Sequence, residues 1–276
     1  MYEELYAPLP DRNLYWERLG MEPPTGEPTR ELLDRMILAH QCRIPFENLD
    51  ACDFRRPISL GIPDIFQKVI VDKRGGYCFE LNSLFDALLQ ETGFKTMPCL
   101  GRSLKDRGYV YPILHRGIMV NLDGERYLAE VGYGGPTPAC AIPLVDGAEL
   151  DSRGQRFRVE LHENGWWHLI YLGSIAKLNA AAERGEEVPP TPAYAILDVP
   201  AALTDFVPLS YFCSTHPDSV FTQWRMVNLR TDDGNISITD DAFTRVTPEG
   251  KETKRVESDD EFRALLSEHF GIELPA

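Results

Sequence analysis

The sequence predicts a mixed α+β protein in which a helical bundle is followed by a β-barrel and then by a small α/β region. This rests on the period of the apolar residues, which is helical up to residue 93 and close to two over 94–199. Strand signals and a closing helix then share residues 200–276. We therefore expect three regions, 1–93, 94–199 and 200–276, and a chain of 276 residues is long enough for them.

Amphipathic helices are expected in the first region. Apolar residues recur at helical spacing between residues 29 and 40, and Thr29 is a suitable N-cap. The pattern continues over 62–70 and again over 79–90, where Gly93 marks the end of the helix. These segments are expected to form the bundle.

Two β-hairpins are expected in the second region. Strand-like alternation over 113–122 and 126–131 flanks the pair Asp123–Gly124, which is typical of two-residue hairpin turns. A second hairpin joins residues 155–161 to residues 166–172. These strands are expected to belong to the barrel.

The remaining segments complete the outline. The stretch 180–192 is polar and rich in proline, and we expect it to be a connection. In the third region, strands are expected at 224–230 and 235–240, and a closing helix at 259–270.

Charge and hydropathy exclude two classes of partner. The formal net charge of −15 and the pI of about 4.8 describe a surface that repels phosphate backbones, so we expect no nucleic-acid partner. No run of 18 apolar residues occurs, so no membrane segment is expected. The polar, acidic first 20 residues lack the features of a signal peptide, and we therefore expect a cytoplasmic location.

The six cysteines are widely spaced, and none forms a Cys-x-x-Cys pair. A disulfide framework is not expected in a reducing compartment, and the spacing does not fit structural zinc. We expect no metal, and most of the cysteines should be buried as small apolar side chains.

Cys78 differs from the other cysteines in its position. It follows Arg74-Gly-Gly-Tyr, where a loop becomes the helix 79–90. Unpaired N–H groups at a helix N-terminus and the nearby charge of Arg74 favour a thiolate, and hence a nucleophile. A buried, inert cysteine at a helix start fits the position equally well, so the role of Cys78 depends on finding a base.

A register argument selects His115 as that base and Glu130 as the group that orients it. If Asp123–Gly124 is a two-residue turn, Leu122 pairs with Glu125, and Glu130 then falls opposite Gly117. His115 lies two residues from Gly117 and therefore on the same face of the sheet as Glu130. As diagonal neighbours, His115 and Glu130 are expected to be about 7–8 Å apart at the backbone. Gly117 is expected to leave room for the carboxylate. A slip of one residue would place the two side chains on opposite faces.

A cysteine, a histidine and a carboxylate in this order form a catalytic triad for acyl transfer. An ordinary surface hairpin with His115 and Glu130 would show the same spacing, so the triad depends on the cysteine motif. The turn Gly132-Tyr-Gly-Gly135 is a further, weaker signal, because closely spaced N–H groups in such turns bind anions.

These motifs resemble the arylamine N-acetyltransferase family. Four of them occur in the order of the family, after a similar N-terminal stretch, and together they span residues 15 to 225. The matching segments are Tyr15–Gly20, Ile44–Asp50, Arg74–Asn82, His115–Gly135 and Ser214–Phe221.

The resemblance implies a helical bundle, a β-barrel and a C-terminal α/β lid around a triad like that of cysteine proteases. It implies ping-pong transfer, in which Cys78 takes an acetyl group from acetyl-CoA and an arylamine, arylhydrazine or N-hydroxyarylamine then removes it. Acetyl-CoA is thus a co-substrate, with no tightly bound cofactor. The implied binding residues are Gly132, Gly134, Gly135 and Ser219 for the donor, and Phe46, Tyr133 and Phe221 for the acceptor.

Three positions depart from the family pattern. Glu130 replaces the usual aspartate, and its extra methylene changes the reach of the carboxylate. Tyr133 replaces a phenylalanine, and its hydroxyl is expected to add a hydrogen bond that biases the choice of acceptor. Phe212 replaces a tyrosine, which removes one polar contact to a ligand.

Three other functions stay open for this chain. An amide synthase or macrolactam-forming acyltransferase would use the same triad with a carrier-bound acyl group. A binding protein could keep the fold and lose turnover through Glu130. A cysteine hydrolase would use water as the acceptor.

Overall fold

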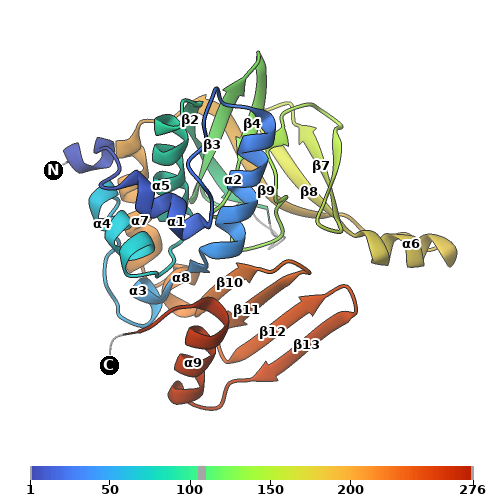
Figure 1. Cartoon of the computed structure of the whole chain (residues 1–276). Coiled ribbons are helices and arrows are strands. Elements are labelled where there is room, and N and C mark those ends of the chain that lie inside the picture. The colour runs from blue at the N-terminus through green and yellow to red at the C-terminus, as the bar shows by residue number, and fades with distance from the viewer. Residues whose placement is uncertain (1, 105–109, 275–276) are drawn as a thin grey trace.

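The structure is a computed structural model that describes residues 2–104 and 110–274, and it confirms the mixed α+β architecture. In Figure 1 the blue and cyan helices lie beside a twisted green and yellow sheet, and a smaller red sheet lies below them. Within the described residues, no helix is both long enough and apolar enough to cross a membrane.

The N-terminal helices pack around α5 (Cys78–Glu91), whose inner residues are almost completely buried. Thr29 caps α2 as expected, because its hydroxyl accepts a hydrogen bond from the N–H of Leu32. The segment expected at 62–70 is a helix that continues into a π-helical turn. The elements are η1 (Glu3–Tyr6), α1 (Arg12–Leu19), α2 (Arg30–Arg43), α3 (Leu49–Cys52), α4 (Ile62–Phe66) and η2 (Gln67–Val71).

Eight strands form a barrel-like antiparallel sheet in the order β5-β4-β3-β2-β9-β8-β7-β6. Both predicted hairpins are present, and Leu122 pairs with Glu125 as the register argument requires. The strands are β2 (Lys95–Ser103), β3 (His115–Leu122), β4 (Glu125–Ala129), β5 (Ile142–Pro143), β6 (Glu149–Ser152), β7 (Gln155–Leu161), β8 (Trp166–Ser174) and β9 (Thr191–Pro200).

A second sheet contains four C-terminal strands and one short strand from the N-terminal part. In β1 (Phe46–Glu47), Phe46 pairs with Asn228, and an isolated bridge joins Phe46 to Gly76 in the loop before Cys78. The C-terminal sheet therefore touches the loop of the candidate nucleophile. Its other strands are β10 (Met226–Arg230), β11 (Asn235–Thr239), β12 (Ala242–Thr247) and β13 (Gly250–Arg255). The helices α9 (Asp259–Leu265) and η4 (Leu266–Phe270) follow these strands and pack against the sheet.

The connection expected at 180–192 is corrected by the structure. Its first part belongs to α6 (Ile175–Glu183), which projects from the body of the molecule in Figure 1. The alanine-rich sequence favours a helix, and Ser174 caps it by accepting from the N–H of Lys177. The expected connection began inside this helix, because charged residues and prolines dominate the stretch from Glu183 onward.

The helices between residues 203 and 223 pack with the N-terminal bundle. They are η3 (Leu203–Asp205), α7 (Phe206–Thr215) and α8 (Val220–Gln223), and Phe206 and Cys213 share the hydrophobic core of α5. The boundaries at 93/94 and 199/200 stay predictions.

His40 is a buried titratable group that makes stability depend on pH. Its imidazole is fully buried in α2, and neither ring nitrogen has a hydrogen-bond partner among the described residues. Burial lowers the pKa of His40 to about 3, and the charge of Arg18 acts in the same direction. The unfolded chain binds this proton with a pKa near 6.5, so folding stability is lost as the pH falls from about 6.5 towards 3.

Replacing His40 by leucine is therefore expected to reduce acid sensitivity. Between pH 7 and pH 4.5, the wild type should lose about 3 kcal/mol more of its unfolding free energy than His40→Leu, because only the wild type must bury a neutral imidazole. Urea unfolding at the two pH values measures this difference. Parallel losses in the two proteins would contradict the assignment.

Candidate active site

The predicted site residues meet at one pocket of about 310 Å³. Cys78 and His115 line it, and Glu130 lies behind His115 with only 1% of its surface exposed. All seven predicted binding residues also line the pocket: Phe46, Gly132, Tyr133, Gly134, Gly135, Ser219 and Phe221. Their roles as catalytic or binding groups stay predictions.

Cys78 is the first residue of α5, as expected, and is 3% exposed. The N–H of Tyr77 just before it donates to Oε2 of Glu80 at 3.1 Å, which fixes the entry into the helix. Gly132 faces Cys78 so closely that an added Cβ would lie 2.8 Å from the Cα of Cys78. A side chain at position 132 would therefore displace the cysteine.

Arg74 does not act on Cys78, which corrects the expectation from the sequence. Its guanidinium pairs with Glu47 at 2.8 Å and with Asp50 at 3.2 Å, and these carboxylates raise its pKa against the effect of burial. The charge of Arg74 is thus used to hold the loop before the nucleophile. Three residues separate Arg74 from Cys78, and the long side chain turns to these carboxylates and away from the sulfur.

Lys68 completes this group of buried charges below the nucleophile loop. Its ammonium contacts Asp50 at 2.7 Å and Glu80 at 2.8 Å. Burial raises the pKa of Glu80 to about 7, although the charge of Lys68 opposes the shift. Glu80, whose carboxylate accepts from the N–H of Tyr77, is therefore stabilised in its charged form mainly by Lys68.

His115 and Glu130 are joined by a hydrogen bond of 2.7 Å between Nε2 and Oε2. The predicted register therefore places them on one face as required. The room beside Gly117 is used differently from the prediction, because Ile196, Leu128 and Cys99 fill it. The glycine that matters for the imidazole is Gly101, which pairs with His115, and an added Cβ there would lie 2.9 Å from the ring.

The other oxygen of Glu130 has two donors. Oε1 accepts from Nδ2 of Asn82 at 2.9 Å and from the N–H of Gly132 at 2.7 Å. With the bond to His115, the buried carboxylate has three partners, and its orientation is fixed. The N–H of Gly132 is directed to Glu130, so it does not belong to an anion-binding nest.

No role was expected for Asn82 from the sequence. A signal was present, because Asn82 lies four residues after Cys78 and therefore on the same face of α5. Its amide also donates to the carbonyl of Arg116, next to His115, at 2.6 Å. Asn82 thus connects the helix of the cysteine with the strand of the histidine.

The electrostatics of the site favour a protonated imidazole. Burial lowers the pKa of His115, but the charge of Glu130 and the hydrogen bond to Cys78 outweigh it and raise the pKa to about 10. Burial raises the pKa of the Cys78 thiol, and the hydrogen bond and charge of His115 oppose that rise. Because Nε2 bonds to Glu130, the other ring nitrogen, Nδ1, is the one that faces the sulfur.

Aromatic rings enclose His115. The ring of Tyr133 lies edge-on to the imidazole at 5.8 Å, and the ring of Tyr194 lies at 5.6 Å. The hydroxyl of Tyr133 donates to the carbonyl of Ala193 at 2.9 Å. The hydroxyl of Tyr133 thus bonds to the sheet, and its effect on the choice of acceptor stays a prediction.

Ser219 also uses its hydroxyl within the protein. The hydroxyl donates to the carbonyl of Cys213 at 2.6 Å and accepts from the N–H of Phe221 at 3.2 Å, where Ser219 caps α8. This arrangement positions the ring of Phe221, which packs against Phe46 and Tyr77 at the pocket wall.

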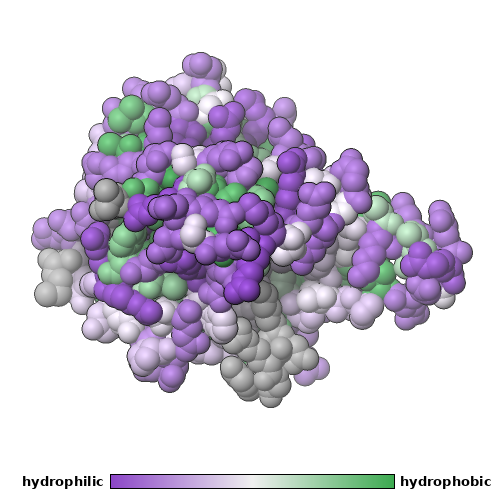
Figure 2. Space-filling view, turned by 90° about the horizontal axis from the view of Figure 1, so that it is seen from below, coloured by the Kyte–Doolittle hydropathy of each residue, from purple (hydrophilic) through white to green (hydrophobic). Residues whose placement is uncertain are grey.

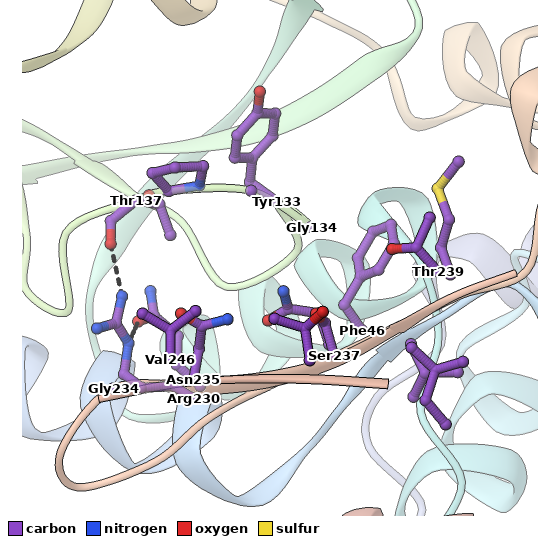
Figure 3. A pocket seen from close by; sticks show the side chains of 18 of the residues that line it. Phe46, Tyr133, Gly134, Thr137, Arg230, Gly234, Asn235, Ser237, Thr239 and Val246 are labelled. Carbon is purple, nitrogen blue, oxygen red and sulfur yellow. Dashed lines mark hydrogen bonds between the residues drawn. The ribbon is translucent and has the colours of Figure 1, made fainter. Parts of the chain in front are cut away.

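A larger pocket of about 740 Å³ adjoins the first. Figure 3 shows it between the turn that carries Tyr133, Gly134 and Thr137 and the strands that carry Arg230, Asn235 and Ser237. Its lining includes two cations, Arg230 and Lys251. The space-filling view in Figure 2 shows the molecule from below, where hydrophilic residues predominate and apolar residues appear in patches between them. The residues that line both pockets are Phe46, Tyr133, Gly134, Gly135 and Met226.

Comparison with known proteins identifies relatives of the chain. A model of the N-acetyltransferase family matches residues 29–276. An arylamine N-acetyltransferase / N-hydroxyarylamine O-acetyltransferase of Salmonella typhimurium is 43% identical over 152 residues, which are 55% of this chain and 53% of that protein. The match thus spans about half the length of that relative.

Other matches span nearly the whole chain. An arylamine N-acetyltransferase of Mycolicibacterium smegmatis is 30% identical over 267 residues, which are 94% of this chain and 91% of that protein. The structure of the Mycobacterium marinum arylamine N-acetyltransferase in complex with CoA has a TM-score of 0.84 at 25% identity, covering 95% of this chain and 93% of that chain.

Proposed function

Because the chain belongs to the arylamine N-acetyltransferase family, we propose that it transfers an acetyl group from acetyl-CoA to an arylamine, an arylhydrazine or an N-hydroxyarylamine. The reaction is ping-pong, and the acetyl group is carried by Cys78 as a thioester. The observation that carries the proposal is the hydrogen-bonded series Cys78–His115–Glu130, which opens onto a pocket lined by aromatic rings.

In the first half-reaction, the sulfur of Cys78 attacks the thioester carbonyl of acetyl-CoA. A new C–S bond forms to Cys78, and the C–S bond to CoA breaks. Protonated His115 donates its Nδ1 proton to the departing CoA thiolate, so the imidazole ends this step neutral. Glu130 holds Nε2 protonated throughout, which leaves Nδ1 as the nitrogen that exchanges the proton.

In the second half-reaction, the nitrogen of the acceptor attacks acetyl-Cys78. Neutral His115 accepts the proton that the amine loses, and the bond between the acetyl carbon and the sulfur breaks. The products are the N-acetylated acceptor and a Cys78 thiolate beside a protonated imidazole. The first turn of α5 supports the anionic sulfur through the positive end of its dipole.

The two adjoining pockets provide places for donor and acceptor. We place the nucleotide end of acetyl-CoA in the larger pocket, where Arg230 and Lys251 can face its phosphates in an otherwise acidic protein. Its acetyl end reaches Cys78 past Tyr133, Gly134 and Gly135, which line both pockets. The acceptor ring then packs beside Phe46, Tyr133 and Phe221.

This chemistry uses two small-molecule substrates and no tightly bound cofactor. CoA is the ligand named for the Mycobacterium marinum structure, and N-hydroxyarylamines are named for the Salmonella typhimurium relative. We also propose a cytoplasmic location, because the chain carries six free thiols, which persist in a reducing compartment.

Intact-mass spectrometry tests the proposal directly. Incubation with acetyl-CoA is expected to add one acetyl group to the protein, and an arylamine or arylhydrazine added afterwards should remove it and yield the N-acetylated product. Prior alkylation of Cys78 should prevent the adduct. Cys42→Ser, which alters a cysteine outside both pockets, should leave it unchanged.

Each other outcome contradicts the proposal in its own way. No adduct would exclude acetyl-CoA as the donor. An adduct that no amine of the panel removes would favour an amide synthase with another acceptor, or a binding protein. Release of free CoA at full rate without any amine would indicate a hydrolase.

A further inference from the structure

We infer that Gln41 and Arg230 are positioning residues for Glu130: together they hold the main chain of the segment 130–138, and Arg230 acts both through Gln41 and through the carbonyl of Thr137. This inference rests on the proposed role of Glu130. Neither residue touches Cys78 or His115, and the two come from α2 and β10, which are far apart in the sequence.

Gln41 holds both ends of the segment 130–138. From the last turn of α2, its Nε2 donates to the carbonyl of Glu130 at 2.8 Å and to the carbonyl of Pro138 at 3.0 Å. Gln41 is 8% exposed, so both hydrogen bonds are shielded from water. The turn between these carbonyls carries Gly132, Tyr133, Gly134 and Gly135, which line the pocket of Cys78.

The peptide unit between Glu130 and Val131 is held by side chains on both sides. Its carbonyl accepts from Gln41, and its N–H donates to Oδ1 of Asn82 at 3.1 Å. β4 ends at Ala129, so the sheet ladder does not fix this peptide. The direction in which Glu130 leaves the strand therefore depends on Gln41 and Asn82.

Arg230 fixes Gln41 and the same turn from the C-terminal sheet. Its Nε donates to Oε1 of Gln41 at 2.8 Å, and its Nη2 donates to the carbonyl of Thr137 at 2.6 Å. Figure 3 shows Arg230 directed up from its strand towards Thr137. Because Oε1 of Gln41 accepts from Arg230, the amide group is oriented with its nitrogen towards Glu130 and Pro138. The C-terminal sheet thus reaches the acid of the triad through two side chains.

A positioning role predicts a defect in the chemistry of Cys78. If Glu130 shifts, its hydrogen bond to His115 weakens, the imidazole loses its proton at lower pH, and the thiol needs a higher pH to react. The measurement is the rate of Cys78 alkylation by iodoacetamide as a function of pH, which requires neither substrate. For Gln41→Leu and for Arg230→Met, we expect the rate at pH 7 to fall by about tenfold or more and the profile to move to higher pH.

The double variant tests whether Arg230 acts through Gln41. Gln41→Leu combined with Arg230→Met should lose less reactivity than the product of the two single losses, because the bond from Nε of Arg230 has already lost its target and only the bond to the carbonyl of Thr137 remains to be removed. In steady-state assays, kcat should fall while the KM of the arylamine stays unchanged. If the loss of alkylation rate in the double variant equalled the product of the two single losses, the inference would be overturned.

Arg225→Met is the matched control. Arg225 lies next to β10, pairs with Asp53 at 2.6 Å and stacks on Phe262, and lines neither pocket. It should lower thermal stability and leave the alkylation profile in place. If Gln41→Leu and Arg230→Met also lowered thermal stability and left the pH profile of Cys78 alkylation unchanged, Gln41 and Arg230 would have only a structural role. The inference would then fail while acetylation of Cys78 by acetyl-CoA could still succeed.

Discussion

Cys78→Ser is expected to abolish acetyl transfer, with kcat/KM reduced by about 10⁴-fold or more. A hydroxyl must lose its proton to become a nucleophile, and its pKa is far above that of a thiol. His115 cannot accept that proton at neutral pH, because Glu130 holds the imidazole protonated with a pKa raised to about 10. A site in which the histidine is already protonated can stabilise a thiolate nucleophile, but it cannot activate a hydroxyl group by removing its proton.

Transfer of radiolabelled acetyl groups from acetyl-CoA to an arylamine measures this loss. The substitution exchanges one atom at a residue that is 3% exposed, so thermal unfolding should change little and serves as the control. If Cys78→Ser kept a large part of the wild-type rate, the nucleophile would have to be another group, and the proposed reaction would be wrong.

Glu130→Gln is expected to reduce kcat by about 10³- to 10⁴-fold while leaving the fold intact. The amide oxygen of the new glutamine can replace Oε1 and accept from Asn82 and Gly132, which directs the NH₂ group at Nε2 of His115. The imidazole must then accept at Nε2 and carry its proton on Nδ1. In that tautomer a neutral His115 cannot accept the proton of the attacking amine.

The same substitution should change the pH dependence of the thiol. Glu130 is the largest contribution that raises the pKa of His115, so without its charge the imidazolium is lost at lower pH. The thiolate of Cys78 then loses the positive charge of His115 that stabilises it. The rate of Cys78 alkylation should therefore rise at higher pH than in the wild type. An unchanged alkylation profile would show that Glu130 does not set the charge of His115.

Glu130→Asp is the informative comparison, since it keeps the charge and removes one methylene. The main chain of Glu130 is held by Gln41 and its carboxylate by Asn82, so the shorter side chain cannot reach all three of its partners. We expect activity between that of the wild type and that of Glu130→Gln. Activity at the wild-type level would mean that the segment 130–132 adjusts to the shorter carboxylate.

Local patterns predicted the elements that carry the triad. The helical period and the loop before it placed Cys78 at the start of α5, and the Asp-Gly turn set the register of β3 and β4. Both are properties of a few neighbouring residues, since turn chemistry and the period of two act over short distances. The hydrogen bond between His115 and Glu130 follows from that register, whatever else surrounds the hairpin.

The interactions around the triad could not be predicted in this way. The bond between Asn82 and Glu130 joins residues 48 apart, that between Gln41 and Glu130 residues 89 apart, and that between Arg230 and Gln41 residues 189 apart. A long polar side chain bonds to whichever partner the packing of distant elements brings near. This is also why Arg74 pairs with Glu47 and Asp50 and not with the sulfur.

The sequence by itself determined which residue is at the start of the helix, which face of the hairpin carries the imidazole and the carboxylate, and hence the chemistry of the site. Only the tertiary structure decided how that carboxylate is held, where the charge of Arg74 goes and how the C-terminal sheet reaches the site. The physical reason is range: backbone periodicity and turns are set by neighbours in the chain, whereas the partners of buried polar groups are set by the packing of elements from the whole chain.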